Sequence, residues 1–159
     1  MSASGWARCP ILTGRAWALG LDVTASLILP PARDPSTPPG DLLLTPIDPD
    51  FPSRVTPGDI LVGGGDFAAG TSDDAGVRAM LARGIAAVIA YSIDPAFARA
   101  ALERGLPAVE VYEALAIHTG ATLRLDLEGT RVVNMSSGDR YPIRNVDDAY
   151  LARFRQADA

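Results

Sequence analysis

The residues best suited to chemistry lie in one short segment, residues 63–74, which reads Gly-Gly-Gly-Asp-Phe-Ala-Ala-Gly-Thr-Ser-Asp-Asp. Its second half places two neighbouring hydroxyl groups, Thr71 and Ser72, between Gly70 and Asp73. An apolar run precedes the segment and a helical pattern follows it, so a strand, a glycine-rich turn and a helix start are expected in series. Such a junction directs backbone N–H groups and the positive end of a helix dipole to one point, which suits a small anionic ligand or a reacting group.

The same segment contains no Lys or Arg, although a site for carboxylates needs a cation. It is also typical of a helix start that holds no site at all. A hydroxyl N-cap would precede acids that complement the dipole, and Asp74 stands where a capping-box acid would reach back. The sequence alone is consistent with both a site and a helix start that holds none. Asp74 and Arg78 are four residues apart and are expected to pair on the helix surface.

The surrounding elements follow an alternating pattern. We predict strands at residues 60–63, 86–91 and 106–111, separated by helices at 73–83 and from Asp94 to a stop at Gly105. This βαβαβ pattern predicts parallel strands joined by right-handed crossovers. A β-hairpin at 122–127 and 131–133 and a short helix at 147–156 complete the carboxyl-terminal part. The sequence therefore predicts an α/β fold.

The amino-terminal part is less regular. We predict short strands at residues 13–21 and 23–29. The following segment, residues 30–52, contains eight prolines, at positions 30, 31, 35, 38, 39, 46, 49 and 52. Proline forbids regular helix in an element interior, so this Pro-rich segment is expected to form a long loop.

Composition narrows the class of protein. The length of 159 residues suits a single domain, here taken as residues 1–159 with short tails at both ends. A net charge of -5 and scattered arginines predict no nucleic-acid partner, and the short apolar runs predict no membrane span, hence a cytoplasmic protein. One cysteine, Cys9, and one histidine, His118, cannot form a disulfide, zinc site or iron–sulfur site within this chain. Any metal is expected in a partner.

Five segments, in unbroken order, carry a resemblance to a known family: residues 14–20, 23–30, 48–51, 57–62 and 84–92. They resemble the small subunit of 3-isopropylmalate dehydratase, which is the swivelling β/β/α domain of the aconitase superfamily. The resemblance implies that this fold docks on a large subunit holding a [4Fe-4S] cluster, with no cofactor bound by this chain. It also implies dehydration and hydration of a hydroxy acid, catalysed by both subunits together.

The resemblance is broken at two motifs. The family segment Asn-Phe-Gly-x-Gly-Ser-Ser-Arg-Glu-His-Ala falls on residues 66–76, so Thr71 stands at the position of the serine base, and Asp73 replaces the substrate-binding arginine. The family's Asp-Thr-Asp falls on residues 24–26, so Ser26 replaces an acid. The resemblance thus implies Thr71 and Ser72 as candidate catalytic residues. The candidate substrate-binding residues are Gly70, Ser72, Asp73, Arg33 and Ser26.

Replacing an arginine by an aspartate removes a charge-assisted pair and adds like-charge repulsion against a carboxylate. Either another arginine, Arg33 or Arg54, supplies the cation, or the substrate has a neutral or cationic group facing Asp73. Three functions follow as hypotheses. The chain is a divergent hydro-lyase small subunit whose substrate is not isopropylmalate, a non-catalytic swivel domain with a structural or regulatory role, or a stand-alone small-molecule binder.

Overall fold

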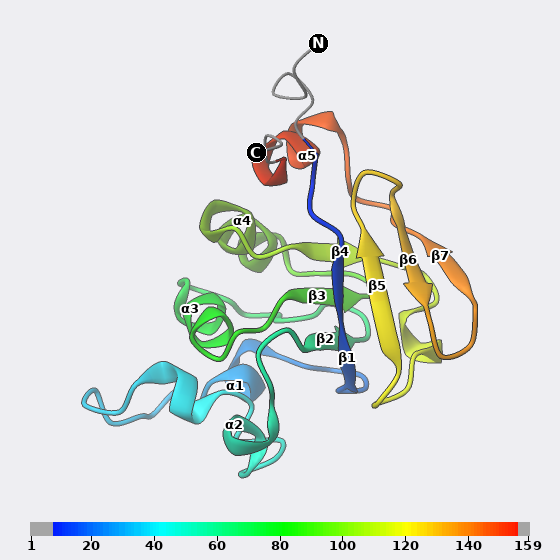
Figure 1. Ribbon diagram of the computed structural model, residues 1–159. Coiled ribbons are helices and arrows are strands. Elements are labelled where there is room, and N and C mark those ends of the chain that lie inside the picture. The colour runs from blue at the N-terminus through cyan, green and yellow to red at the C-terminus, as the bar shows by residue number, and fades with distance from the viewer. Residues whose placement is uncertain (1–7, 156–159) are drawn as a thin grey trace.

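The computed structural model describes residues 8–155, and a single seven-stranded sheet organises this part of the chain (Figure 1). The strand order is β4-β3-β2-β1-β5-β6-β7, with parallel pairing from β1 to β4 and antiparallel pairing from β1 through β5 and β6 to β7. The strands are β1 (Leu12–Ala18), β2 (Ile60–Gly63), β3 (Ala87–Ala90), β4 (Ala108–Glu110), β5 (Thr122–Asp126), β6 (Arg131–Asn134) and β7 (Arg140–Pro142).

Within residues 8–155, five helices and two 3-10 turns, η2 and η3, accompany the strands. They are α1 (Ala25–Ile28), η2 (Pro39–Leu42), α2 (Phe51–Arg54), α3 (Ala75–Ala82), α4 (Pro95–Arg104), η3 (Ala114–Ala116) and α5 (Asp148–Phe154). The succession β2-α3-β3-α4-β4 confirms the predicted parallel βαβαβ unit, and β5-β6 confirms the hairpin. Helix α4 has the predicted cap, because the Asp94 carboxylate accepts the N–H groups of Ala96 and Phe97 at 3.0 and 3.2 Å. It ends at Gly105, whose φ is +81°.

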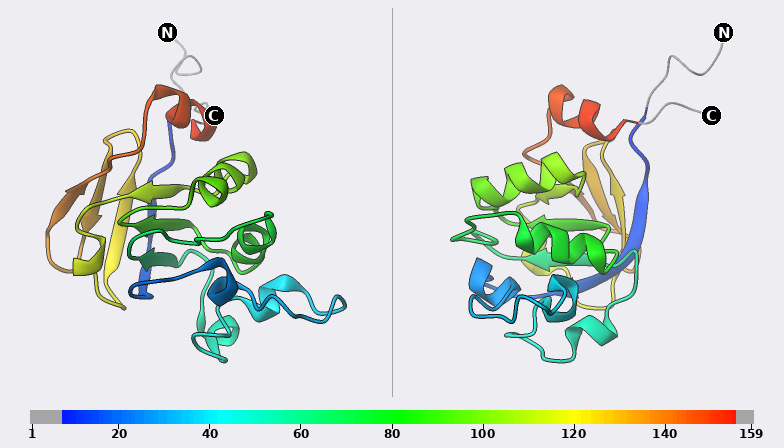
Figure 2. Two further views of the ribbon diagram at one scale, coloured as in Figure 1. Left: turned by 180° about the vertical axis from the view of Figure 1, so that it is seen from behind. Right: turned by 90° about the vertical axis from the view of Figure 1, so that its left-hand side faces the viewer.

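Strand β1 joins the two parts of the sheet. Its residues 16–18 pair with β2, and its residues 12–15 pair with β5. The sheet turns at this strand, so β5, β6 and β7 lie on the side of the parallel strands away from α3 and α4 (Figures 1 and 2). The parallel strands are therefore covered on both faces, which explains why β2 and β3 are apolar and buried throughout.

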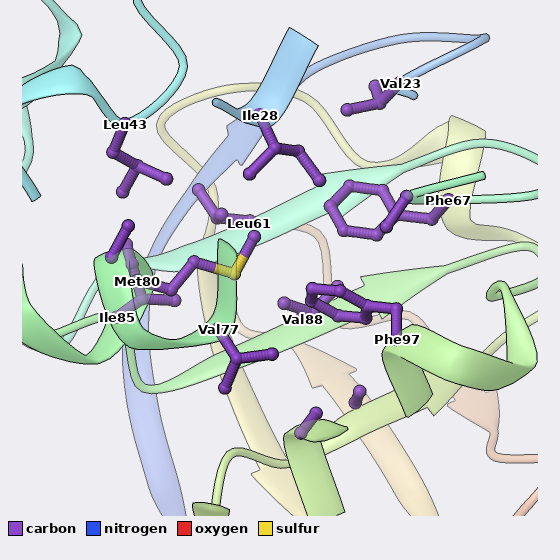
Figure 3. Close-up of a cluster of buried hydrophobic side chains, with 14 of the residues drawn as sticks. Val23, Ile28, Leu43, Leu61, Phe67, Val77, Met80, Ile85, Val88 and Phe97 are labelled. Atoms are coloured by element: carbon purple, nitrogen blue, oxygen red, sulfur yellow. The ribbon is translucent and has the colours of Figure 1, made fainter. Parts of the chain in front are cut away.

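Two hydrophobic clusters cover the two faces of the parallel strands. Leu61, Met80, Val88 and Phe97 belong to the cluster between the parallel strands and the helices (Figure 3). The second cluster lies between the opposite face and the hairpin, and it contains Ile60, Val62, Ile89, Leu123 and Leu125.

The predicted strand at residues 23–29 is wrong, because four of these residues form helix α1. Only Thr24 forms an isolated bridge, to Ala69, and its carbonyl then accepts the N–H of Ile28 at 3.2 Å. This helical turn buries Ile28 and Leu29 together in the first cluster. A short apolar run carries no periodicity that separates a strand from a buried helical turn.

The Pro-rich segment contains two helical turns, η2 and α2, so the prediction of a loop without helix is wrong at these places. Both turns begin with a proline in their first two positions, where the missing N–H costs nothing. The segment is packed into the core through Leu43, Leu44 and Phe51, each at most 2% exposed. Arg83 of the α3 end donates to the Gly40 carbonyl at 2.9 Å and so ties the segment to α3.

Candidate functional site

The loop between β2 and α3 is fixed by backbone hydrogen bonds to two other segments. The N–H of Phe67 donates to the Ser92 carbonyl at 2.9 Å, and the N–H of Ala68 donates to the Val23 carbonyl at 2.7 Å. The Phe67 ring is fully buried and meets Phe97 edge to face, with centroids 5.6 Å apart. The geometry of residues 70–74 is therefore set by the end of β3, by α4 and by the segment before α1.

One glycine at the start of this loop serves packing. A Cβ on Gly63 would lie 2.5 Å from the Phe67 ring, and one on Gly64 would lie 2.8 Å from Cδ2 of Leu21. The buried Phe67 ring cannot move aside, so glycine is required at residue 63, whereas the exposed Leu21 side chain beside Gly64 can rotate away. Packing thus accounts for Gly63 without a bound phosphate, whereas a Cβ on Gly65 would make only ordinary contacts.

A cavity of about 190 Å³ lies beside this loop, between α1, the first turn of α3 and α4. It brings together all six residues predicted for the site, although these come from three separate segments. The lining consists of Ala25, Ser26, Ile28, Leu29, Pro31, Arg33, Gly70, Thr71, Ser72, Asp73, Ala75, Gly76 and Phe97. The lining thus combines apolar with polar and charged side chains, as in pockets for small molecules.

The hydroxyl of Thr71 does not cap α3, so the predicted hydroxyl N-cap is wrong. It donates to the carbonyl of Ala68 at 2.6 Å, which leaves its oxygen lone pairs free to accept. Asp73, one residue before the N-cap Asp74, instead supports the helix start, because its Oδ1 accepts the N–H of Ala75 at 2.9 Å. Ser72 is exposed between them and forms no hydrogen bond within residues 8–155.

Asp74 does not act as a capping-box acid either. It forms the predicted pair with Arg78 at 3.0 Å and a second pair with Arg104 of α4. The hydrogen bond from Arg104 is the main cause that lowers the pKa of Asp74 below its usual range. Asp74 therefore connects α3 to α4 and does not line the cavity.

The two candidate replacement arginines have different positions. Arg33 lines the cavity and donates to the Pro30 carbonyl at 3.1 Å. Arg54 pairs with Asp48 at 2.6 Å and lies over the Trp17 ring, so the alternative that Arg54 enters the site is wrong. Arg33 is thus the cation available to a ligand in this cavity.

The remaining candidate groups for chemistry lie elsewhere. His118 is exposed after η3, and Cys9 is buried, with burial as the main cause that raises the pKa of its thiol to about 11. Within residues 8–155, no three His, Cys, Asp or Glu side chains are grouped so as to hold a metal ion. The side chains present in this part of the chain do not fit an iron–sulfur cluster. No helix in that same part is long and apolar enough to cross a membrane.

Comparison with known proteins decides the family. No family model matches the chain. It is 36% identical over 134 residues to the 3-isopropylmalate dehydratase small subunit of Nautilia profundicola, which covers 82% of this chain and 81% of the relative. The chain belongs to the family of 3-isopropylmalate dehydratase small subunits.

Two further comparisons agree with this family. The small subunit of isopropylmalate/citramalate isomerase from Methanocaldococcus jannaschii is 41% identical over 85 residues, which cover 52% of this chain and 51% of the relative. The crystal structure of 3-isopropylmalate dehydratase from the same organism matches with a TM-score of 0.81 and 30% identity, over 89% of this chain and 86% of that one. The small-subunit fold expected from the sequence segments is confirmed.

The sequence did not predict the apolar wall of the cavity that contains Thr71. Ile28, Leu29 and Phe97 form that wall, from α1, its carboxyl end and α4. The predicted strand at residues 23–29 did not indicate that Ile28 and Leu29 line the same cavity as Thr71. The signal available was the Asp-Pro start of α4, which places Phe97 in the first turn of that helix.

Proposed function

We propose that this chain is the small subunit of an aconitase-type hydro-lyase, which dehydrates and hydrates a hydroxy acid together with a large subunit. The observation that carries the proposal is the cavity that gathers Thr71, Ser72 and Arg33 against an apolar wall. Family membership supports the large-subunit partner. The [4Fe-4S] cluster belongs to that partner in this proposal, because the described part of this chain provides no ligand set for it.

Thr71 is the group that moves the proton in this proposal. The neutral hydroxyl, whose hydrogen is directed to the Ala68 carbonyl, is not a base. In this proposal a base of the large subunit first takes that hydrogen, and the resulting Thr71 alkoxide takes the proton from the substrate C–H. The proposed role of Ser72 is to donate a hydrogen bond to the substrate, since its hydroxyl has no partner within residues 8–155. The buried wall formed by Ile28 and Phe97 excludes water from one side of the ligand.

The charges of the cavity define the substrate that we propose. Among residues 8–155, Arg33 is the one cation that lines the cavity and Asp73 the one anion. A carboxylate of the substrate would bind at Arg33, whereas the group near Asp73 must be neutral or cationic. We therefore propose a hydroxy acid other than isopropylmalate, with a single carboxylate in this cavity.

The test is purification of the tagged chain from its own cells without oxygen, followed by a turnover screen with hydroxy mono- and dicarboxylic acids. We expect an iron–sulfur protein to co-purify in equal amount, and the complex to dehydrate a monocarboxylic substrate preferentially. Thr71→Ala should lower kcat by about 10²-fold or more, the usual size of a lost acid–base group, whereas Thr71→Ser should retain activity. A chain that purifies without such a partner would overturn the proposal.

Asp73→Asn tests the charge argument separately. The asparagine keeps an oxygen that accepts the Ala75 N–H but removes the negative charge, so KM for dicarboxylates should fall while the melting temperature changes little. Asp50→Asn is the matched control, because Asp50 is exposed and does not line the cavity. If both the wild type and Thr71→Ala form the complex and neither complex turns over a hydroxy acid, the chain is instead a non-catalytic swivel domain.

A further inference from the structure

A second concave site lies on the outer face of the antiparallel strands, away from the candidate active site. Leu123, Leu125 and Val132 point inward to the second cluster, so the alternate residues of β5 and β6 point outward. Figures 1 and 2 show this face turned away from α3 and α4. It encloses a cavity of about 210 Å³ lined by Arg124, Asp126, Arg131, Val133, Met135 and Arg140.

The strand register places the arginines around one point. Val133 pairs with Arg124 on one side and with Arg140 on the other. Neighbouring strands are about 4.8 Å apart, so these two arginines start about 10 Å from each other across Val133. Both side chains are long enough to reach one small ligand above Val133, and Arg131 borders the same space two residues along β6.

This arginine cavity has an excess of positive charge, although the net charge of the whole chain is -5. Asp126 pairs with Arg131 at 3.4 Å and also accepts the N–H of Gly129 at 2.9 Å. Arg124 and Arg140 form no ion pair and no side-chain hydrogen bond within residues 8–155, whereas most of the other arginines there do. Three guanidinium groups against one carboxylate leave two positive charges.

We propose that this arginine cavity binds a phosphate dianion, either free phosphate or the phosphoryl group of a small organic phosphate. A phosphate group carries about 1.5 to 2 negative charges at neutral pH, which matches the two uncompensated positive charges. Its tetrahedral oxygens accept from several directions, as arginines from three strands require, and guanidinium groups bind phosphate through paired N–H donors. The site is independent of the proposed hydro-lyase activity.

Isothermal titration calorimetry of the full chain with inorganic phosphate, at constant ionic strength in chloride, tests the proposal. We expect one phosphate per chain. Arg124→Gln and Arg140→Gln should each weaken binding by about tenfold or more, the usual effect of losing a hydrogen bond to a charged group. Arg99→Gln is the matched control, because Arg99 is an exposed arginine of α4 with no ion pair in the described residues, and it should bind phosphate like the wild type.

Asp126→Asn gives a readout that a merely structural role would not produce. Asparagine retains an oxygen for the Gly129 N–H but removes the one negative charge, so phosphate should bind several-fold more tightly. Methyl phosphate distinguishes the two sources, since binding equal to that of phosphate indicates an organic phosphate and much weaker binding indicates free phosphate. Absence of binding, equal effects of Arg124→Gln and Arg99→Gln, or tighter binding of malonate than of phosphate would each overturn the proposal.

Discussion

At the scale of single residues, Asp73 has two roles that its family's arginine could not combine. Its carboxylate accepts the N–H of Ala75 and so supports the start of α3, and it also places a negative charge in the cavity. An arginine has no acceptor and could not supply the first role. Ala68 is a related case, because its φ of +65° is a conformation that favours glycine, the residue that the family motif has there. Both residues therefore differ in type from the family motif, and each has a defined place in the backbone of this loop.

Glu128 gives a pH-dependent prediction at the same scale. It accepts from Arg155 at 2.8 Å and from the Cys9 N–H at 3.1 Å, and the Arg155 hydrogen bond is the main cause that lowers its pKa from 4.5 to about 2. A carboxylate with a lowered pKa stabilises the fold above pH 4.5, and this contribution is lost as the pH falls toward 2. At pH 7, the Glu128→Gln protein should therefore unfold at a lower urea concentration than the wild type. The difference between the two midpoint concentrations should shrink as the pH falls toward 2.

The control for this prediction is Asp148→Asn. The Asp148 side chain is 98% exposed and lies 3.9 Å from the same arginine, so its loss should change stability little at either pH. An equal deficit of Glu128→Gln at pH 7 and pH 2 would contradict the prediction.

At the scale of elements, local signals account for what could be predicted. Helix α4 has Asp94 before it, Pro95 at its first position and Gly105 after it, and each acts through its own backbone geometry. Strand β7 was missed because its three residues have no pattern of their own and are held by pairing with β6. Helix α1 was missed because its helical form depends on contacts with the β2–α3 loop. Likewise, the motif positions predicted the cavity's polar residues, while its apolar wall required the tertiary structure.

Gly14 provides a test of how β1 packs on its neighbour. A Cβ at this position would lie 1.9 Å from the carbonyl oxygen of Gly58, which is backbone and cannot move aside as a side chain can. Gly14→Ala should therefore destabilise the fold by about 1–3 kcal/mol or more in urea unfolding, as overpacking does.

The control for this change is Gly65→Ala, at a position with only ordinary contacts, 3.7 Å from Ser92 Oγ. It should unfold close to the wild type. A Gly14→Ala protein as stable as Gly65→Ala would show that β1 can shift away from residue 58 without loss.

At the scale of the whole molecule, the two candidate ligand sites lie on different parts of the sheet. The cavity with Thr71 lies on the helical side, beside α1, α3 and α4, and the arginine cavity lies on the outer face of β5–β7. The parallel strands and both hydrophobic clusters lie between them. A large subunit that covers the Thr71 cavity can therefore leave the arginine cavity accessible to small anions.

The pairing of β1 with both parts of the sheet determines how the molecule unfolds locally. One half of this strand bonds to β2 and the other half to β5, so neither part of the sheet can detach without leaving an unpaired edge on the same strand. Amide hydrogen exchange under native conditions should then give residues 12–15 and 16–18 the same opening free energy, equal to that of global unfolding. Earlier exchange of residues 12–15 alone would instead mean that β5–β7 separates first. The amides of β1 are thus expected to exchange only when the whole molecule unfolds.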